Sequence, residues 1–131
     1  MCLQEVDHEE LYFQFLSDQG YSFRSNSRRG KDSLVIAWRH SKLEHVSDFG
    51  IQHDDLQQLF KEGSDFKRGN CALFVTLRYL ETGFEFQVAT THLHWNKQKD
   101  FVKYAQIMNT CNHLSEDKPV ILCGDLNSSP D

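Results

Sequence analysis

Residues 120–130 read Val120-Ile121-Leu122-Cys123-Gly124-Asp125-Leu126-Asn127-Ser128-Ser129-Pro130 and pass from apolar to polar within a few positions. The continuously apolar run at 120–123 predicts a strand that is covered on both faces. Residues 124–131 predict a polar loop leaving this strand, which is where α/β sheets collect ligands. In an extended segment Asp125 and Asn127 face the same side, about 6.6 Å apart. Asp, Asn, Ser and Pro also favour ordinary turns, so a turn without function is the alternative.

Two further polar clusters follow predicted strands. Glu5 closes the first strand, and His92 and His94 follow a strand in the middle of the chain. Adjacent buried strands would bring these side chains and Asp125 to one rim of a sheet. Carboxylate and amide oxygens suit Mg²⁺ or Mn²⁺ better than zinc. Two alternatives stay open: Glu5 as a solvated carboxylate at a strand end, and a zinc site in which Cys123 or Asp125 joins the two histidines.

The pattern along the chain mixes antiparallel hairpins with strand–helix–strand crossovers, which predicts an α/β fold with a mixed sheet or two stacked sheets. Residues 71–80 and 84–91 predict the clearest hairpin. Residues 34–39 and 43–49 predict a second hairpin across a polar turn. The other predicted strands are 2–6, 21–24 and 120–123, with a polar loop at 25–32.

Three helices are predicted from apolar spacing. In the first, Asp7 is the expected N-cap, Glu10 completes a capping box, and Gly20 lies just past the end. The second is a short helix over 54–60, and the third covers 100–114 with an apolar face turned to the core. The apolar residues at helical spacing are Leu11, Tyr12, Phe15 and Leu16 in the first helix, Leu56, Leu59 and Phe60 in the second, and Phe101, Tyr104, Ile107, Met108 and Cys111 in the third.

The length of 131 residues allows one domain with a real core. The longest apolar runs are far shorter than the ~20 residues of a membrane span, and no signal sequence opens the chain. We therefore expect no membrane association. A net charge of -5 argues against holding nucleic acid by basic residues alone, although divalent ions on carboxylates can bridge to phosphates. Four cysteines without C-x-x-C spacing predict buried thiols in an intracellular protein: Cys2, Cys71, Cys111 and Cys123.

Three strings together resemble the endonuclease/exonuclease/phosphatase superfamily: Cys2-Leu3-Gln4-Glu5-Val6, Thr91-His92-Leu93-His94-Trp95, and the loop string quoted above. The order L-Q-E-V, T-H-L, G-D-x-N-S-x-P is similar to the deadenylase branch, which includes carbon-catabolite-repressor-type deadenylases, nocturnin, angel proteins and 2′-phosphodiesterase. Lys31-Asp32-Ser33-Leu34-Val35-Ile36 looks like the family's K-x-D-G strand, although Ser33 departs from it. Gly69-Asn70-Cys71-Ala72-Leu73 looks like its R-D-N-V-A-L strand, with Gly69 in place of the acid.

The resemblance implies a DNase I-like fold, a four-layer α/β/β/α sandwich of mixed sheets with the active site at strand ends. Carried over residue by residue, it implies that Glu5 and Asp125 bind Mg²⁺, with Mn²⁺ as an alternative. Asp125 would also orient the attacking water. His92 would neutralise charge on the scissile phosphate, and Asn127 would hydrogen-bond a phosphate oxygen. This division of labour offsets the charge that builds in an in-line displacement.

Five further residues are candidates for supporting the site or contacting phosphate. His94 lies one strand repeat from His92, and Asn70 belongs to the second of the weaker matches. Arg28, Arg29 and Lys31 lie on the loop before a strand, where a basic loop can contact a nucleic-acid backbone. A solvated basic loop without function is the alternative.

The resemblance implies a Mg²⁺-dependent phosphodiesterase, in the first place a 3′-to-5′ exonuclease that acts on poly(A) RNA. The alternatives are a 2′-phosphodiesterase, a dinucleotide phosphatase, a DNA-repair nuclease, or a non-enzymatic product such as a truncated paralogue or a partial gene product. Residues 1–131 are expected to form a partial domain, without its first strand and its C-terminal portion. We therefore expect this chain alone to be weakly active or inactive. The expected location is the cytoplasm, with nucleus and mitochondrion as alternatives.

Overall fold

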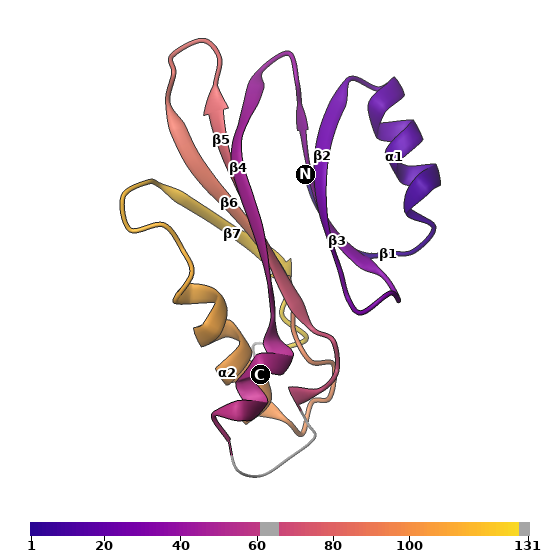
Figure 1. Cartoon of the computed structure of the whole chain (residues 1–131), viewed down its shortest axis with the longest axis vertical. Coiled ribbons are helices and arrows are strands. Elements are labelled where there is room, and N and C mark those ends of the chain that lie inside the picture. Colours follow the sequence, from indigo (N-terminus) through magenta and orange to yellow (C-terminus); the bar gives the residue numbers. More distant parts are fainter. Residues whose placement is uncertain (61–65, 129–131) are drawn as a thin grey trace.

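The computed structural model describes residues 1–60 and 66–128, which form two β-sheets with a helix beside each (Figure 1). The elements are β1 (Cys2–Val6), α1 (Glu9–Asp18), β2 (Tyr21–Ser27), β3 (Ser33–Arg39), β4 (Leu43–Gln52), the 3₁₀ helix η1 (His53–Gln58), β5 (Cys71–Tyr79), β6 (Glu85–His92), α2 (Asp100–Cys111) and β7 (Val120–Asp125). The first sheet has the order β1-β3-β2 and is antiparallel. The second has the order β4-β5-β6-β7, and its β6–β7 pair is parallel. Residues 129–131 of the predicted polar loop lie outside the described residues.

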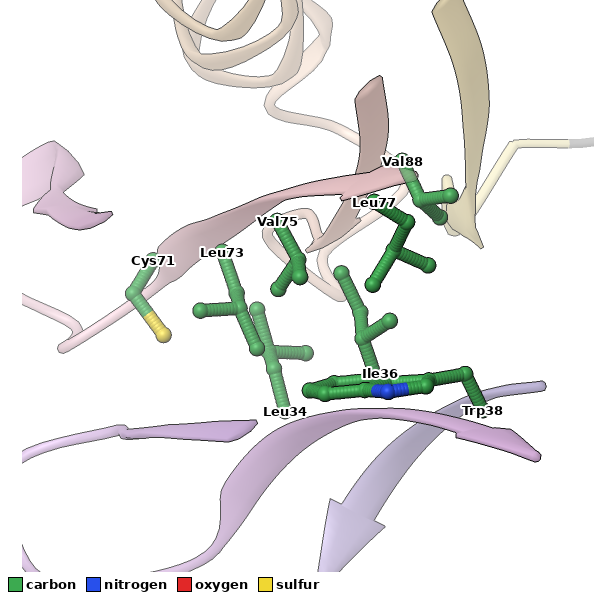
Figure 2. Close-up of a cluster of buried hydrophobic side chains, with 8 residues drawn as sticks. All are labelled: Leu34, Ile36, Trp38, Cys71, Leu73, Val75, Leu77 and Val88. Carbon is green, nitrogen blue, oxygen red and sulfur yellow. The ribbon is translucent and has the colours of Figure 1, made fainter. Parts of the chain in front are cut away.

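An apolar layer between the two sheets forms the centre of the molecule. Alternate side chains of β3 point toward β5 across this layer, and Figure 2 shows them meeting the side chains of β5. The burial of branched and aromatic side chains between two sheets supplies most of the driving force for this packing. The cluster consists of Leu34, Ile36, Trp38, Cys71, Leu73, Val75, Leu77 and Val88.

Helices cover the outer face of each sheet. The intervening residues of β3, Val35 and Ala37, face away from the second sheet and pack with Leu16 of α1. On the outer face of the second sheet, Phe74 packs with Leu114, which follows α2. The layers therefore run helix, sheet, sheet, helix. This order confirms the predicted α/β/β/α arrangement.

The hairpin predicted from residues 34–39 and 43–49 is wrong, because β3 and β4 belong to different sheets. β3 already pairs with β1 along one edge and with β2 along the other, so neither edge can accept β4. The chain instead crosses to the second sheet, where β4 pairs with β5. The predicted hairpin of β5 and β6 is confirmed.

The start of the chain differs from the prediction in two places. The predicted capping box is wrong: His8, not Asp7, is the N-cap of α1, with φ 46° and no side-chain cap. The Ser33 hydroxyl instead donates a hydrogen bond to the Glu9 carboxylate and fastens the first turn to β3. The predicted loop at 25–32 is also too long, because residues 25–27 continue β2 and pair with β3.

The predicted core face of the third helix is wrong. Phe101, Tyr104 and Met108 are 59%, 62% and 42% exposed. The helix instead buries Val102 and Ala105 in an apolar cluster, and it buries Lys103 and Gln106 against polar groups that follow the strand ends. The helix predicted at 54–60 is the 3₁₀ helix η1; within its predicted apolar face Leu56 is buried whereas Leu59 is exposed.

The prediction that the strand at 120–123 is covered on both faces is also wrong. Among the described residues β7 pairs only with β6, and Ile121 and Leu122 are 52% and 38% exposed. The prediction of four buried cysteines fails at Cys111, which lies exposed near the end of α2, while Cys71 is buried. Within residues 1–60 and 66–128, no helix is long and apolar enough to cross a membrane.

Candidate active site

Three candidate residues meet where β1, β6 and β7 end. The Nε2 atom of His92 lies 4.0 Å from Oε1 of Glu5 and 3.9 Å from Oδ2 of Asp125. His92 and Asp125 are brought side by side by the parallel register of β6 and β7. Glu5 comes from the other sheet, and a hydrogen bond of 2.9 Å from Gln4 to Thr90 joins the two sheets beside it.

Glu5 occupies a backbone bulge. Its φ of 54° lies in the left-handed region, and the pairing of β1 with β3 shifts register between Leu3 and Val6. Bulges redirect side chains at strand ends, and positive φ at a residue other than glycine costs about 1–3 kcal/mol. The bulge interrupts the strand's alternation where the Glu5 carboxylate approaches the imidazole of His92 across the sheets.

Gly124 allows β7 to approach β6 closely beside these residues. It has a φ of 150°, and a Cβ atom at this position would lie 2.2 Å from the carbonyl oxygen of Thr91. Only glycine fits such an approach without displacing a strand. Because Thr91 precedes His92 and Gly124 precedes Asp125, this contact sets the spacing of the two functional candidates.

The segment from Asp125 to Asn127 is a turn, so the expectation of an extended segment is wrong. Asn127 has a φ of 49°, and its main-chain N–H donates to Oδ1 of Asp125 over 2.8 Å. The Asn127 side-chain Nδ2 donates to the carbonyl of Leu93 at 2.9 Å. Asp and Asn commonly stabilise turns through such local bonds. Asn127 therefore holds the loop against the end of β6 and fixes the Asp125 carboxylate.

The two carboxylates fit a magnesium-like ion better than zinc. The Glu5 and Asp125 side chains are 67% and 54% exposed, whereas the His92 side chain is 6% exposed. Within residues 1–60 and 66–128, no group of three His, Cys, Asp or Glu side chains is placed to hold a metal ion. Mg²⁺ commonly takes one or two carboxylates and fills its other positions with water and phosphate oxygens. Structural zinc needs four protein ligands, and catalytic zinc three.

The two supporting candidates nearest the site lie in a buried polar network. Asn70 is 3% exposed, and its Nδ2 donates to the carbonyl of His92 over 2.8 Å. His94 is 2% exposed, and its main-chain N–H donates to Oε1 of Gln106 over 2.8 Å. Asn70 thus contacts the main chain of His92 from within the protein, and Gln106 contacts the main chain of His94.

The basic candidates are partly engaged by acidic neighbours. Arg28 pairs with Asp32 at 2.8 Å, and Arg29 pairs with the buried carboxylate of Asp54 at 2.5 Å. Lys31 is exposed on the same loop. The two arginines therefore hold the loop in place, although the Arg29 side chain, like Lys31, is exposed to solvent.

Several residues around the site are not among the candidates found in the sequence. His53 is fully buried behind it, with Nε2 3.3 Å from the Thr91 hydroxyl. Burial, with a smaller contribution from His113, lowers the pKa of His53 to about 4. Lys103 and Gln106 could not be identified, because the polar residues of their helix look like an ordinary solvated face. Trp95 could have been identified from the sequence, because an aromatic residue follows the two histidines. Its side chain is exposed, at 69%.

A four-layer sandwich with carboxylates and a histidine gathered at its strand ends defines a DNase I-like protein. The sequence pattern of the Endonuclease/Exonuclease/phosphatase family matches residues 1–131. The chain belongs to this family of metal-dependent phosphodiesterases and exonucleases.

Individual relatives lie in the branch that the sequence resembles. Protein angel of Drosophila melanogaster is 31% identical over 144 residues and covers 100% of this chain. The CCR4-Not complex 3'-5'-exoribonuclease subunit Ccr4 of Kluyveromyces lactis is 26% identical over 176 residues and also covers 100%. Among solved structures, ANGEL2, a 2',3'-cyclic phosphatase, matches 98% of this chain with a TM-score of 0.75 and 26% identity. The chain spans only 39%, 21% and 39% of these three proteins.

Proposed function

We propose that this chain carries part of the active site of a Mg²⁺-dependent phosphodiesterase that removes nucleotides from the 3′ end of RNA, with poly(A) as its first substrate. The observation that carries the proposal is the meeting of Glu5, His92 and Asp125, from strands of two sheets, within 4.0 Å of one imidazole nitrogen. Three groups that are far apart in the sequence have no structural need to converge at a solvent-facing rim.

In the proposed mechanism Glu5 and His92 have one task each and Asp125 has two. Glu5 and Asp125 would hold the ion, which when bound supplies positive charge for the phosphate oxygens. His92 is held rigidly by burial, and its Nε2–H donates to a non-bridging phosphate oxygen. Asp125 uses Oδ1 to accept the Asn127 N–H, so its Oδ2, on the His92 side, is the atom that orients the attacking water. Charge is thus offset where it develops.

Single-stranded RNA is the substrate class that the surroundings favour. The exposed indole of Trp95 stands three residues after His92 and offers a face on which a base can stack. Lys31 adds an exposed positive charge, and the carboxylate-bound ion would offset the acidity of the chain. The Ccr4 relative is a 3'-5'-exoribonuclease, which agrees with this choice.

A second substrate is favoured by one comparison. ANGEL2 is a 2',3'-cyclic phosphatase, so a terminal cyclic phosphate is a further candidate for the same site. A 2′-linked oligoadenylate, a dinucleotide phosphate and a damaged DNA end remain the other candidates within the family. We place the protein inside the cell, in agreement with four cysteines that form no disulfide among the described residues.

We also propose that residues 1–131 form only part of the catalytic domain, so that the isolated chain turns over slowly or not at all. In support, the chain spans 39% of angel, and β7 leaves apolar side chains exposed at a sheet edge. The chain would then need the remaining residues of the domain for full activity. A truncated paralogue without activity is the alternative.

The test is a single-turnover assay with a labelled A₂₀ RNA, Mg²⁺ and excess protein, beside a full-length angel or Ccr4 protein. We expect the chain to shorten the RNA at least about 100-fold more slowly than the full-length relative, in a reaction that EDTA and His92→Ala abolish. His40→Ala, which removes an exposed histidine, is the matched control and should change nothing. Comparable turnover contradicts the partial domain, and activity that survives His92→Ala contradicts the site. Parallel reactions with 2′,3′-cyclic phosphate ends and 2′-5′ oligoadenylate distinguish the substrates.

A further inference from the structure

The buried face of α2 carries polar side chains beside two apolar ones, Val102 and Ala105, which pack with Leu56 and Phe66. The side chain of Lys103 is 8% exposed, and Gln106, one turn later, is 0% exposed. Burying an ammonium and an amide is costly unless each is bonded. Both are bonded. Lys103 bonds to the turn after β7 and to Asp100 of α2, and Gln106 bonds to the segment after β6 and to Asn70, which precedes β5.

Lys103 reaches the turn after β7. Its Nζ donates to the main-chain carbonyl of Asn127 over 3.2 Å and pairs with Asp100 at 2.9 Å. The same Asn127 donates its N–H to Oδ1 of Asp125. The ammonium thus acts on the turn that fixes the orientation of the Asp125 carboxylate, without touching that carboxylate itself.

Gln106 reaches the end of β6 by two routes. Its Oε1 accepts the N–H of His94 over 2.8 Å, and its Nε2 donates to Oδ1 of Asn70 over 3.3 Å. Asn70 in turn donates to the carbonyl of His92 over 2.8 Å. The side chain of Gln106 therefore holds the main chain of His94 directly and the carbonyl of His92 through Asn70.

We propose that Lys103 and Gln106 are positioning residues, and that α2 sets the distance and orientation between His92 and Asp125. The two side chains are three positions apart on one helix, so they move together and link the ends of β6 and β7 to a single rigid element. The inference deepens the proposed function, because it assigns a second layer of residues to the same site. Such supporting contacts often change metal affinity about 10–100-fold when they are removed.

Thr110 provides a comparison within the same helix. It is fully buried, and its hydroxyl donates to the carbonyl of Gln106, which belongs to α2 itself. Thr110→Val therefore removes a buried hydrogen bond from α2 without removing a bond to β6 or β7. A merely structural role for α2 predicts that Thr110→Val and Lys103→Met behave alike once both proteins are folded.

The first experiment measures Mn²⁺ affinity of the whole chain by calorimetry, at a temperature where thermal melts show every variant to be folded. Removal of the positive charge by Lys103→Met should strengthen cation binding if charge alone matters. We expect the opposite, a weakening of about tenfold, with Lys103→Arg within threefold and Thr110→Val within twofold of the wild type. Lys103→Met binding within threefold or more tightly overturns the proposal, as does an equal weakening in Thr110→Val.

The second experiment needs no metal and separates this inference from the proposed function. The N–H of Leu93 donates to the carbonyl of Asp125 over 2.9 Å and joins the ends of β6 and β7 without touching Lys103 or Gln106. We expect its hydrogen exchange to accelerate at least about tenfold in Lys103→Met and Gln106→Met, relative to the amide of Phe74, and to stay unchanged in Thr110→Val. Unchanged exchange overturns the proposal. Accelerated exchange in a chain that binds no Mn²⁺ supports the positioning role and contradicts the metal site.

Discussion

The two helices of the sandwich occupy equivalent outer layers and do different work. α1 buries Leu16 against Val35 and Ala37, and the Glu9–Ser33 hydrogen bond adds a polar contact only at its first turn. α2 also has an apolar cluster, but it buries Lys103 and Gln106 as well, which bond to the main chain just beyond the ends of β7 and β6. The apolar contact makes few geometric demands, whereas the polar contact is directional. The α1 layer therefore stabilises the fold, and the α2 layer also determines the geometry of the candidate site.

The largest effect is expected from Gly124→Ala, which tests the α2 half of this comparison where β7 closely approaches β6. The added Cβ would meet the Thr91 carbonyl oxygen at 2.2 Å, at a φ of 150°. Overpacking together with an unfavourable φ should lower the free energy of unfolding by about 4 kcal/mol and weaken Mn²⁺ binding. Urea unfolding measures the change. Gly83→Ala is the control, because that glycine has a φ of 73° but open space around it, and it should cost only about 1 kcal/mol.

Leu16→Ala tests the α1 half of the comparison by removing the apolar contact of this helix with the first sheet. Leu16 is 3% exposed within an apolar cluster, so truncation should lower the free energy of unfolding by about 3 kcal/mol. Mn²⁺ affinity of the folded variant should stay within twofold of the wild type, because among the residues that the structure describes no polar contact leads from α1 to Asp125. A variant that lost stability and metal affinity together would remove the distinction between the two layers.

His53, buried behind the candidate site, makes the stability of the chain sensitive to acid. Its pKa is about 4 in the folded chain and 6.5 when exposed, so only the unfolded chain binds a proton between these values. The contribution of His53 to the free energy of unfolding is present above pH 6.5 and is lost as the pH falls toward 4. Between pH 7 and pH 5 this loss is about 2 kcal/mol. Urea unfolding at pH 7 and at pH 5 should show this loss of free energy in the wild type and not in His53→Gln. An equal pH dependence in both proteins would refute the assignment.

The smallest effects are expected at the outer faces of the two helices. Phe15 of α1 and Tyr104 of α2 are 63% and 62% exposed. Substituting either with Ser should change the free energy of unfolding by no more than about 0.5 kcal/mol, since exposed positions contribute little. Thermal melts of Phe15→Ser and Tyr104→Ser measure this. A loss above 1 kcal/mol in either would show that the sequence-based core face was right for that helix.

Much of the sandwich was predictable because alternating or continuous apolar residues mark β5, β6 and the inward residues of β3. The partner of β4 was not, because pairing depends on which sheet edges remain free, and β3 had none. The inward face of α2 was also not predictable. Its buried face combines the small apolar residues Val102 and Ala105 with Lys103 and Gln106, and apolar spacing alone does not identify such a mixed face.

The candidate site shows the same division. Short strings located Glu5, His92 and Asp125 at strand ends, and the parallel register of β6 and β7 places His92 beside Asp125. The bulge at Glu5 was not predictable, because its left-handed backbone depends on pairing with β3, which is distant in the sequence. The residue types of the loop indicated a turn at Asn127 as the alternative, but the bond that holds this turn to Leu93 was not predictable. Lys103 was missed for a related reason: its partner is a main-chain carbonyl, which leaves no trace in residue types.

The most direct test of the central claim is the melting temperature of the chain with and without Mg²⁺. If Glu5 and Asp125 hold one ion, Mg²⁺ at 100 times its Kd should stabilise the chain by about 2.7 kcal/mol and raise the melting temperature by several degrees. Glu5→Ala should abolish the rise, whereas Glu10→Ala, which removes an exposed carboxylate on α1, should retain it. A rise that persists in Glu5→Ala, or no rise in the wild type, would contradict the account.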